Sequence, residues 1–296
     1  MFPPRFWPAA KTRSSLVVTA GLSPQGVKSL TQTGSDMPST SQNPCVCFTC
    51  GTQFAPTDLE PICCPICEDD RQYVATGGQR WTTHTQLLEE GYHNALRAEE
   101  PCVLGIGTEP SFAIGQRALL IQTGEGNILW DCVTVLDGDT RARIHELGGV
   151  QAIAISHPHF YSRMADWAEE FQAKRLELFG GATLLRLGGH FPGSAVLHWA
   201  PGADRRGILC TGDTIQAVPR AGYVSFMYSY PNLLPLPADE VERIRSAVEG
   251  WGLDFEVLYG GWFGRAVHED AKAAVLQSAD RYVGLLRGTL KKHWNS

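Results

Sequence analysis

Six of the nine cysteines in this 296-residue chain lie within the 23 residues from Cys45 to Cys67. Four of them form two Cys-x-x-Cys pairs, Cys47 with Cys50 and Cys64 with Cys67, and thirteen residues separate the pairs. Each Cys-x-x-Cys turn lets two thiolates bind one ion, and two such turns complete a tetrahedral shell. A segment this short cannot bury a core of its own, so the ion would supply most of its folding free energy. The spacing therefore predicts a small structural metal site.

Zinc is the ion that we expect at these cysteines. Their odd total and their clustering favour metal binding in a reducing compartment over a disulfide framework. The pairs resemble those of rubredoxin iron sites, but Glu68 stands where a glycine is expected, and thirteen residues are too few for a rubredoxin fold. A structural, redox-silent zinc ribbon is therefore favoured. Cys45 and Cys63 are spare in this interpretation, although Cys63 could replace Cys64 as a ligand.

Residues 1–44, which precede the ribbon, are rich in Pro, Ser, Thr and Gly without sustained periodicity. Up to Asp36 they contain arginines and lysines but no acidic residue. This composition is that of a disordered tail, and it also fits a mitochondrial transit peptide. Met37 is an alternative start. We expect a cytoplasmic protein, with a mitochondrial location as the alternative.

The rest of the chain divides into three parts by its patterns. Residues 45–72 form the predicted ribbon, and the polar residues 73–105 are interpreted as a connecting arm with a helix through Thr85–Ala98. Residues 106–296 carry apolar strand patterns followed by helix patterns. Expected strands are 116–123, 127–132, 152–156, 183–187, 195–199, 207–211 and 255–259, and expected helices are 141–147, 164–173, 239–250 and 269–287. Since several strands end in polar residues, we expect α/β or α+β layers with a site at the strand ends.

Three fragments at the ends of expected strands carry residue types that bind catalytic metals. Ser-His157-Pro-His159 follows one strand, Gly-Gly-His190-Phe-Pro-Gly-Ser precedes another, and Cys-Thr-Gly-Asp213 ends a third. Two histidines one residue apart can face one ion if the turn after a strand splays them. A third histidine would complete an imidazole set, and an aspartate could close the shell or hold a metal-bound water.

In this order the fragments resemble the HxHxDH, GHxxGS and TGD motifs of the metallo-β-lactamase superfamily. The resemblance covers residues 106–296 and implies a four-layer αββα sandwich with the metal at one edge. It implies that His157, His159 and His190 bind the first metal ion and that Asp213 is the bridging aspartate. Asp131 ends a strand where the family often has an aspartate that supports the site, so a supporting role is expected for it.

The chain departs from the family at the ligands of the second metal. Tyr161 and Ser162 stand where the family has an Asp and a His, and Trp262 occupies the turn that usually carries the last His. His268 follows six residues later and is a weak candidate ligand, more readily explained as a residue at a helix start. The sequence therefore predicts one ion, in a degenerate site.

Three functions remain open at this point. The first is a single-metal hydrolase, with zinc as the expected ion and Asp213 orienting the water and acting as base, for a small ester, thioester or lactone. The second is a non-haem iron oxidoreductase, because imidazoles with one carboxylate also suit Fe(II). The third is a binding or scaffold protein in which the metal only stabilises. The net charge of −6 argues against nucleic acid, no apolar stretch suits a membrane, and the oligomeric state is open.

Overall fold

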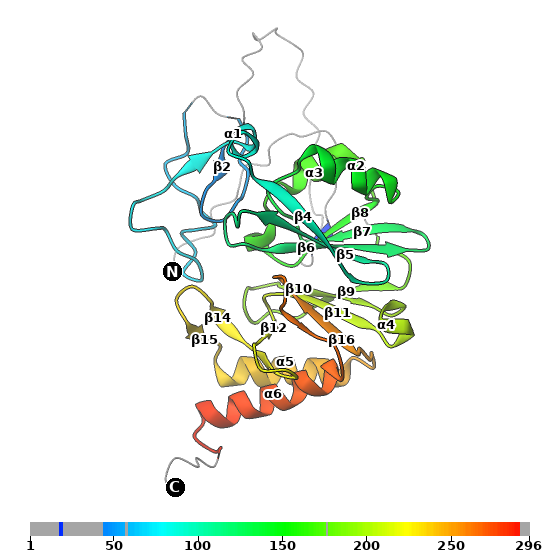
Figure 1. Cartoon of the computed structure of the whole chain (residues 1–296). Helices are drawn as coiled ribbons and strands as arrows, with labels where there is room; N and C mark the ends of the chain where they lie inside the picture. The colour runs from blue at the N-terminus through cyan, green and yellow to red at the C-terminus, as the bar shows by residue number, and fades with distance from the viewer. Residues whose placement is uncertain (1–17, 20–43, 57–58, 176, 291–296) are drawn as a thin grey trace, which may run out of the picture.

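The computed structural model describes residues 18–19, 44–56, 59–175 and 177–290 (Figure 1). Apart from residues 18–19 and 44, the predicted N-terminal tail lies outside the described residues. Two β-sheets face each other in the middle of the molecule, and the cysteine-rich segment lies beside one end of them (Figure 1). Among the described helices, none is long and apolar enough to cross a membrane.

The first sheet has six strands and mixes antiparallel with parallel pairing. Its strands from one edge to the other are β1 (Val18–Thr19), β8 (Ala152–Ile155), β7 (Gly126–Trp130), β6 (Arg117–Thr123), β5 (Val103–Glu109) and β4 (His93–Glu100). The expected strands at 116–123 and 127–132 form a hairpin, since β6 and β7 pair in antiparallel register up to Thr123 and Gly126. Strand β8 pairs with β7 in parallel. The turn that contains His157 follows the carboxyl end of β8.

The second sheet has five strands and carries the other two site fragments. In order they are β17 (Ala266–Val267), β16 (Val257–Gly260), β11 (Ile208–Gly212), β10 (Ala195–Trp199) and β9 (Ala182–Arg186). Four shorter strands, arranged as two pairs, follow β11 in the chain: β12 (Gln216–Ala217) with β13 (Val224–Ser225), and β14 (Met227–Ser229) with β15 (Leu234–Pro235).

Helices cover the outer face of each sheet (Figure 1). On the first sheet lie α2 (Gly138–Glu146) and α3 (Met164–Phe171), and on the second lie α5 (Ala238–Gly250) and α6 (Ala271–Leu286). Three apolar clusters fill the spaces: one between the first sheet and its helices, one between the sheets, and one between the second sheet and its helices. The predicted four-layer αββα sandwich is therefore confirmed.

Burial on both faces explains why the central strands were recognisable in the sequence. All five residues of β10 and of β11 are buried, as are the first five of β6. Strands covered on both sides have near-continuous apolar runs. The turns that carry polar site residues stand out against such runs.

The expected helix through Thr85–Ala98 is wrong in its second half. Helix α1 (His84–Glu89) begins at a capping box between Thr83 and Gln86 and lasts only six residues. Gly91, at φ +88, then turns the chain, and the residues of β4 pair with β5 in antiparallel register. Part of the segment assigned to a connecting arm thus belongs to the first sheet, because pairing with β5 outweighs its helical propensity.

Strand β5 went unrecognised because glycines interrupt its apolar pattern. A side chain at Gly105 or Gly107 would collide with the ring of Phe263, which packs over this strand. The two glycines therefore mark a close approach between the first sheet and the turn after β16.

His84, at the start of α1, gives the fold a predicted sensitivity to acid. Its Nε2 accepts a hydrogen bond from the backbone N–H of Leu136 at 3.1 Å. Burial, with help from the charges of Arg163 and Arg141, lowers the pKa of His84 to about 4. Between pH 6.5 and about 4 the unfolded chain binds a proton that the folded chain excludes, so this contribution to stability falls as the pH falls.

Thermal unfolding of the full chain at pH 7 and pH 5 tests this. His84→Gln should lower the unfolding temperature at pH 7 and lose less additional stability at pH 5 than the parent does. His93→Gln, at an exposed histidine, serves as the control. If the unfolding temperatures of the parent and of His84→Gln fall equally between pH 7 and pH 5, His84 is not the cause of the sensitivity to acid.

Candidate metal centres

The structure brings the four predicted cysteines of the ribbon together. Cys47 and Cys67 place their Sγ atoms 3.5 Å apart, and the Sγ atoms of Cys50 and Cys64 lie 3.6 Å apart. A tetrahedral zinc site with Zn–S bonds of about 2.3 Å requires sulfur separations of about 3.8 Å. All four side chains are buried, and their ligand atoms all lie within 4.8 Å of one another. The sulfurs therefore fit a zinc ion, with Cys45 and Cys63 outside the group.

The surroundings of this cluster suit thiolates. Gln79 donates a hydrogen bond from Nε2 to Cys47 Sγ at 3.2 Å, and the rings of Phe54 and Trp81 pack edge to face beside the sulfurs. The strands β2 (Val46–Cys47) and β3 (Trp81–Thr82) pair to hold the first turn. Gly51 adopts φ +77, and a side chain there would strike Thr134 of the sandwich.

The second cluster lies where predicted strands end. Strand β8 leads into the short 3-10 helix η1 (Pro158–Phe160), which presents His157 and His159. His190 lies in the turn before β10, and Asp213 follows β11. Because the two sheets face each other, residues separated by more than fifty positions meet at one edge of the sandwich.

The donor atoms of this cluster point at one another. His157 Nε2 lies 3.2 Å from Asp213 Oδ1, and His190 Nε2 lies 3.3 Å from Asp213 Oδ2. His190 Nε2 also lies 3.3 Å from His159 Nδ1. One ligand atom from each of the four residues lies within 4.8 Å of the others, which is the spacing of a single ion's shell.

Outer contacts fix the orientation of two of the imidazoles. His190 Nδ1 donates to the carbonyl of Met227 at 2.9 Å, which leaves Nε2 without a proton and facing the cluster. His157 Nδ1 lies 3.1 Å from Ser156 Oγ. On the inner side, His157 Nε2 and Asp213 Oδ1 are buried without a hydrogen-bond partner among the described residues. A cation at the centre would satisfy both atoms.

Burial sets the protonation of the cluster. Desolvation, reinforced by the neighbouring histidines, lowers the pKa of His157 well below its usual value and lowers that of His159 to about 3. Both imidazoles are therefore neutral, the form that binds metal. Desolvation raises the pKa of Asp213, against the opposing influence of His190. A cation beside this carboxylate would compensate the burial of its charge.

The residues at the family's second-metal positions are engaged elsewhere. Ser162 Oγ accepts from Gln116 Nε2 at 2.8 Å and donates to the carbonyl of Cys132 at 3.2 Å. Tyr161 packs against the apolar cluster between the first sheet and its helices. Trp262 Nε1 donates to the carbonyl of Ile114.

His268 stays outside the cluster of four donors. It is exposed and contacts the ring of Tyr259, with centroids 6.2 Å apart. It precedes α6, as the sequence analysis favoured.

Asp131 lies directly behind the site. It is fully buried with φ +59, and its Oδ1 accepts the backbone N–H of Ser156 at 2.7 Å. Burial raises the pKa of Asp131 to about 8. Its Oδ2 faces Gly212, where a Cβ would come within 3.3 Å of it. Asp131 therefore fixes the backbone of the residue before His157. It makes no hydrogen bond to any of the four donor residues.

Aromatic side chains form the wall of the site. Tyr230 donates from its hydroxyl to the carbonyl of Asp213 at 2.9 Å, and its ring lies 5.7 Å from that of His190. The ring of Phe191 lies 5.8 Å from His157 and 5.5 Å from His159. The donor residues are only 0 to 4% exposed, so these rings and their neighbours close the site.

The cysteine-rich segment also contacts this wall. The Arg71 guanidinium stacks 5.1 Å from the centre of the Phe191 ring and 4.6 Å from that of Tyr228. Ser229 donates to the carbonyl of Arg71 at 2.9 Å, and Asn232 donates to that of Gln72 at 3.1 Å. These contacts join residues 120 to 160 positions apart, which is why no local pattern revealed them.

A second contact joins the ribbon to the segment that follows η1. The backbone N–H of Gln53 donates to the carbonyl of Ser162 at 3.0 Å, and its side chain donates to Asp166 at 2.9 Å. The ribbon therefore contacts the loops that carry the candidate ligands at two separate places.

Comparison with known proteins places these features in context. No protein-family model matches the chain. YmaE of Bacillus subtilis (strain 168), described as an uncharacterized protein, is 46% identical over 270 residues, which is 83% of this chain and 97% of YmaE.

Solved structures that match include metallo-β-lactamases of low sequence identity. One, from Cronobacter sakazakii with a HARLDQ motif, is 16% identical, covers 66% of this chain and 93% of its own, and has a TM-score of 0.41. Another, FIM-1 from Pseudomonas aeruginosa in the mono-zinc form, is 15% identical, covers 64% and 96%, and has a TM-score of 0.41.

Proposed function

We propose that this chain, which belongs to the same family as YmaE of Bacillus subtilis, is a metal-dependent hydrolase with one catalytic ion. The observation that carries the proposal is the convergence of His157 Nε2, His159 Nδ1, His190 Nε2 and the Asp213 carboxylate in a buried site. Neutral imidazoles and a carboxylate without hydrogen-bond donors on their inner side are a donor set for a cation. Zinc is the ion we assign, and iron is the alternative.

The chemistry follows from the donor set. When bound, a zinc ion at such a site lowers the pKa of a water molecule and polarises a carbonyl oxygen. The Asp213 carboxylate would help to hold the ion and would orient a water molecule and accept its proton. His190 is kept with Nε2 unprotonated by the Met227 carbonyl, and Asp131 holds the backbone before His157. Phe191 and Tyr230 exclude bulk water.

The residues at the second-metal positions support a single ion. Ser162 uses its hydroxyl within the core, Tyr161 is packed, and Trp262 fills the last turn. Without a second cation to stabilise a leaving oxygen, an ester, thioester or lactone suits the site better than a phosphodiester.

A scaffold role is the rival function, and one observation favours it. The four donor residues are almost fully buried, whereas a catalytic ion must be reached by substrate. Under this alternative the ion would stabilise the edge of the sandwich and no turnover would occur.

Metal analysis joined to kinetics tests the proposal. Protein purified without added metal should contain two ions per chain, and metal-dependent turnover should appear on a panel of p-nitrophenyl esters and thioesters. Asp213→Asn keeps the shape but removes the charge that orients and deprotonates the water, so turnover should fall by about 100-fold or more while part of the metal stays.

Asp254→Asn, at an exposed carboxylate, is the matched control and should leave turnover unchanged. Zinc at both sites supports the hydrolase, and one zinc with one iron supports the oxidoreductase. A parent that turns over none of the panel, or that does so equally with a chelator present, would favour the scaffold.

A further inference from the structure

An open cavity of about 560 Å³ lies beside the loop that carries His190. Its walls come from three separate parts of the chain: the ribbon, the end of β9 with the loop after it, and α5. The residues that matter here are Arg71, Arg186, Gly188, Gly189, Glu240 and Arg243.

Positive charge is in excess in this cavity. It has three guanidinium groups and one carboxylate, that of Glu240, which pairs with Arg243 at 2.9 Å. Arg186 has no ion pair with any described residue. Arg71 pairs with Asp69 at 2.9 Å and with Asp70 at 3.4 Å, yet its Nε is buried without a hydrogen-bond partner among the described residues. In a chain of net charge −6, the unpaired Arg186 and the Nε of Arg71 are the groups in this cavity that are available to an anion.

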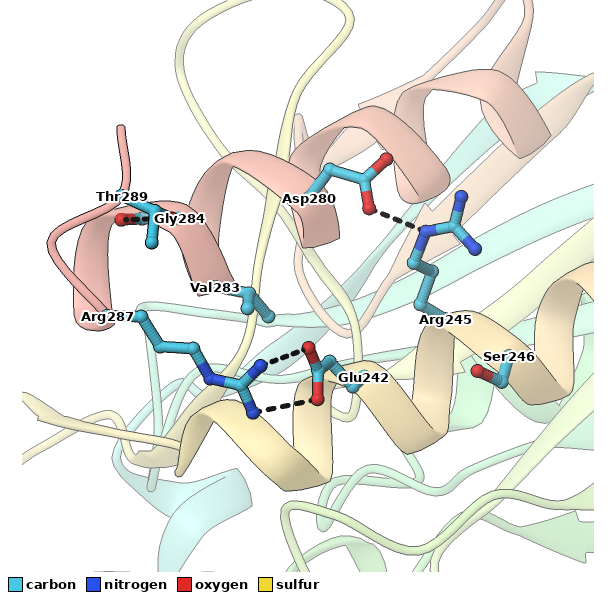
Figure 2. A pocket seen from close by; sticks show the side chains of 8 residues that line it. All are labelled: Glu242, Arg245, Ser246, Asp280, Val283, Gly284, Arg287 and Thr289. Carbon is cyan, nitrogen blue, oxygen red and sulfur yellow. Dashed lines mark hydrogen bonds and ion pairs between the residues drawn. The ribbon is translucent and has the colours of Figure 1, made fainter. Parts of the chain in front are cut away.

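A neighbouring cavity shows what a balanced set of charges looks like. Figure 2 shows the hollow between α5 and α6, where Arg287 faces Glu242 and Arg245 faces Asp280. Each arginine there is neutralised by a carboxylate, so no charge is left for a ligand. In the cavity beside the His190 loop, Arg71 and Arg243 have carboxylate partners, but Arg186 has no ion pair with any described residue.

The loop in the cavity wall lies close against α5. Gly188 and Gly189 both adopt positive φ, at +67 and +84. A Cβ at Gly188 would lie 3.1 Å from the Arg243 guanidinium, and one at Gly189 would lie 2.7 Å from Ile244. Small residues thus let the backbone approach the guanidinium, and the next residue in the chain is His190.

Arg71 connects the cavity to the histidine cluster. It lines the cavity and stacks on Phe191, whose ring lies against His157 and His159. An anionic group in the cavity would therefore lie one side chain away from the metal cluster.

We propose that this cavity binds the anionic group, a carboxylate or a phosphate, of a small substrate whose ester, thioester or lactone reaches the metal cluster. Arginine forks match both anions with paired hydrogen bonds. The proposal deepens the function proposed above and rests on it. It assigns Arg186 and Arg243 to substrate binding and makes the ribbon, through Arg71, part of the binding site.

Calorimetric titration of the metal-loaded full chain tests anion binding without turnover. Succinate and inorganic phosphate are compared at equal ionic strength, with chloride as the reference anion. Arg186→Gln and Arg243→Gln should each weaken binding of the preferred anion by about tenfold, because each removes charge-assisted hydrogen bonds. Arg220→Gln removes the same charge at a residue that stacks on Tyr223 and should have no effect.

The preferred anion identifies the anionic group of the substrate. Stronger phosphate binding indicates a phosphorylated substrate, and stronger succinate binding indicates a substrate with a carboxylate. Equal weakening by Arg220→Gln, or no binding above chloride in the parent, would overturn the proposal. Loss of binding in Arg186→Gln and its retention in Arg186→Lys would support it.

Kinetics then separate this proposal from the hydrolase itself. Arg186→Gln should raise KM for p-nitrophenyl hydrogen succinate about tenfold and leave that for p-nitrophenyl butyrate unchanged. If Arg186→Gln changes KM for the two esters by the same factor, and metal-dependent turnover is intact, the anion site is refuted and the hydrolase is not. If the parent binds the anion and the arginine variants do not, but the parent shows no turnover, the hydrolase is refuted and the anion site is not.

Discussion

Cys64→Ser is expected to remove one metal ion per chain and to unfold the ribbon. Cys64 is fully buried, and its sulfur lies 3.6 Å from that of Cys50, so a serine there leaves three thiolates around a polar gap. Because apparent binding free energies of structural zinc reach about 10–16 kcal/mol in small peptides, most of the segment's stability depends on the complete shell. Residues 45–82 should become sensitive to protease, and metal content should fall by one.

Cys63→Ser provides the control for this change. Cys63 is adjacent in sequence but only partly buried, and it lies outside the group of four sulfurs. The Cys63→Ser protein should keep the metal content and the protease resistance of the parent. If Cys64→Ser retains the parent's metal content, or if Cys63→Ser loses as much, the assignment of ligands is wrong.

His190→Ala should cost the protein the second ion and all metal-dependent turnover. The substitution removes Nε2, which lies 3.3 Å from both Asp213 Oδ2 and His159 Nδ1, and leaves the Met227 carbonyl without its donor. Changes beyond the ligand shell already weaken metal affinity by about 10–100-fold, so loss of a ligand should exceed that range. Competition with a chromogenic chelator measures the affinity directly.

His268→Ala distinguishes this interpretation from a conventional second site. His268 is exposed, contacts Tyr259, and lies outside the cluster, so its removal should change metal affinity less than twofold or so. Equal loss of metal in the two variants would mean that His268 reaches an ion and that the second site is retained.

The fold was predictable from the sequence wherever strands are covered on both faces. Residues 117–123, 195–199 and 208–212 form largely buried strands within one residue of the expected ranges, because continuous apolar runs leave little alternative. Strand β4 was missed because it is half exposed and its residues suit a helix equally well. Strand β5 was missed because its glycines serve a contact with Phe263, 156 positions after Gly107.

The four candidate ligands of the site were predictable from the sequence, but the side chains that form the wall around them were not. His157, His159, His190 and Asp213 lie in short motifs at strand ends, and strand ends of a layered fold meet at one edge. The wall depends on distant contacts, such as that of Arg71 with Phe191, for which spacing within the chain gives no signal. Long-range packing of this kind is fixed only once the sheets have assembled.

The two contacts that join the ribbon to the sandwich bear on how fast an ion can leave the histidine cluster. The carbonyls of Arg71 and Gln72 accept hydrogen bonds from Ser229 and Asn232, close in the chain to Met227, whose carbonyl contacts His190. The N–H of Gln53 donates to the carbonyl of Ser162, three residues after His159. Movement of either segment away from the ribbon would break these bonds. An enclosed ion would exchange with the medium at the rate of that opening, independently of its intrinsic affinity. The metal present when the chain first folds would then be kinetically retained. Exchange of labelled zinc should accelerate when the ribbon is stripped, even though the two ion sites share no ligand.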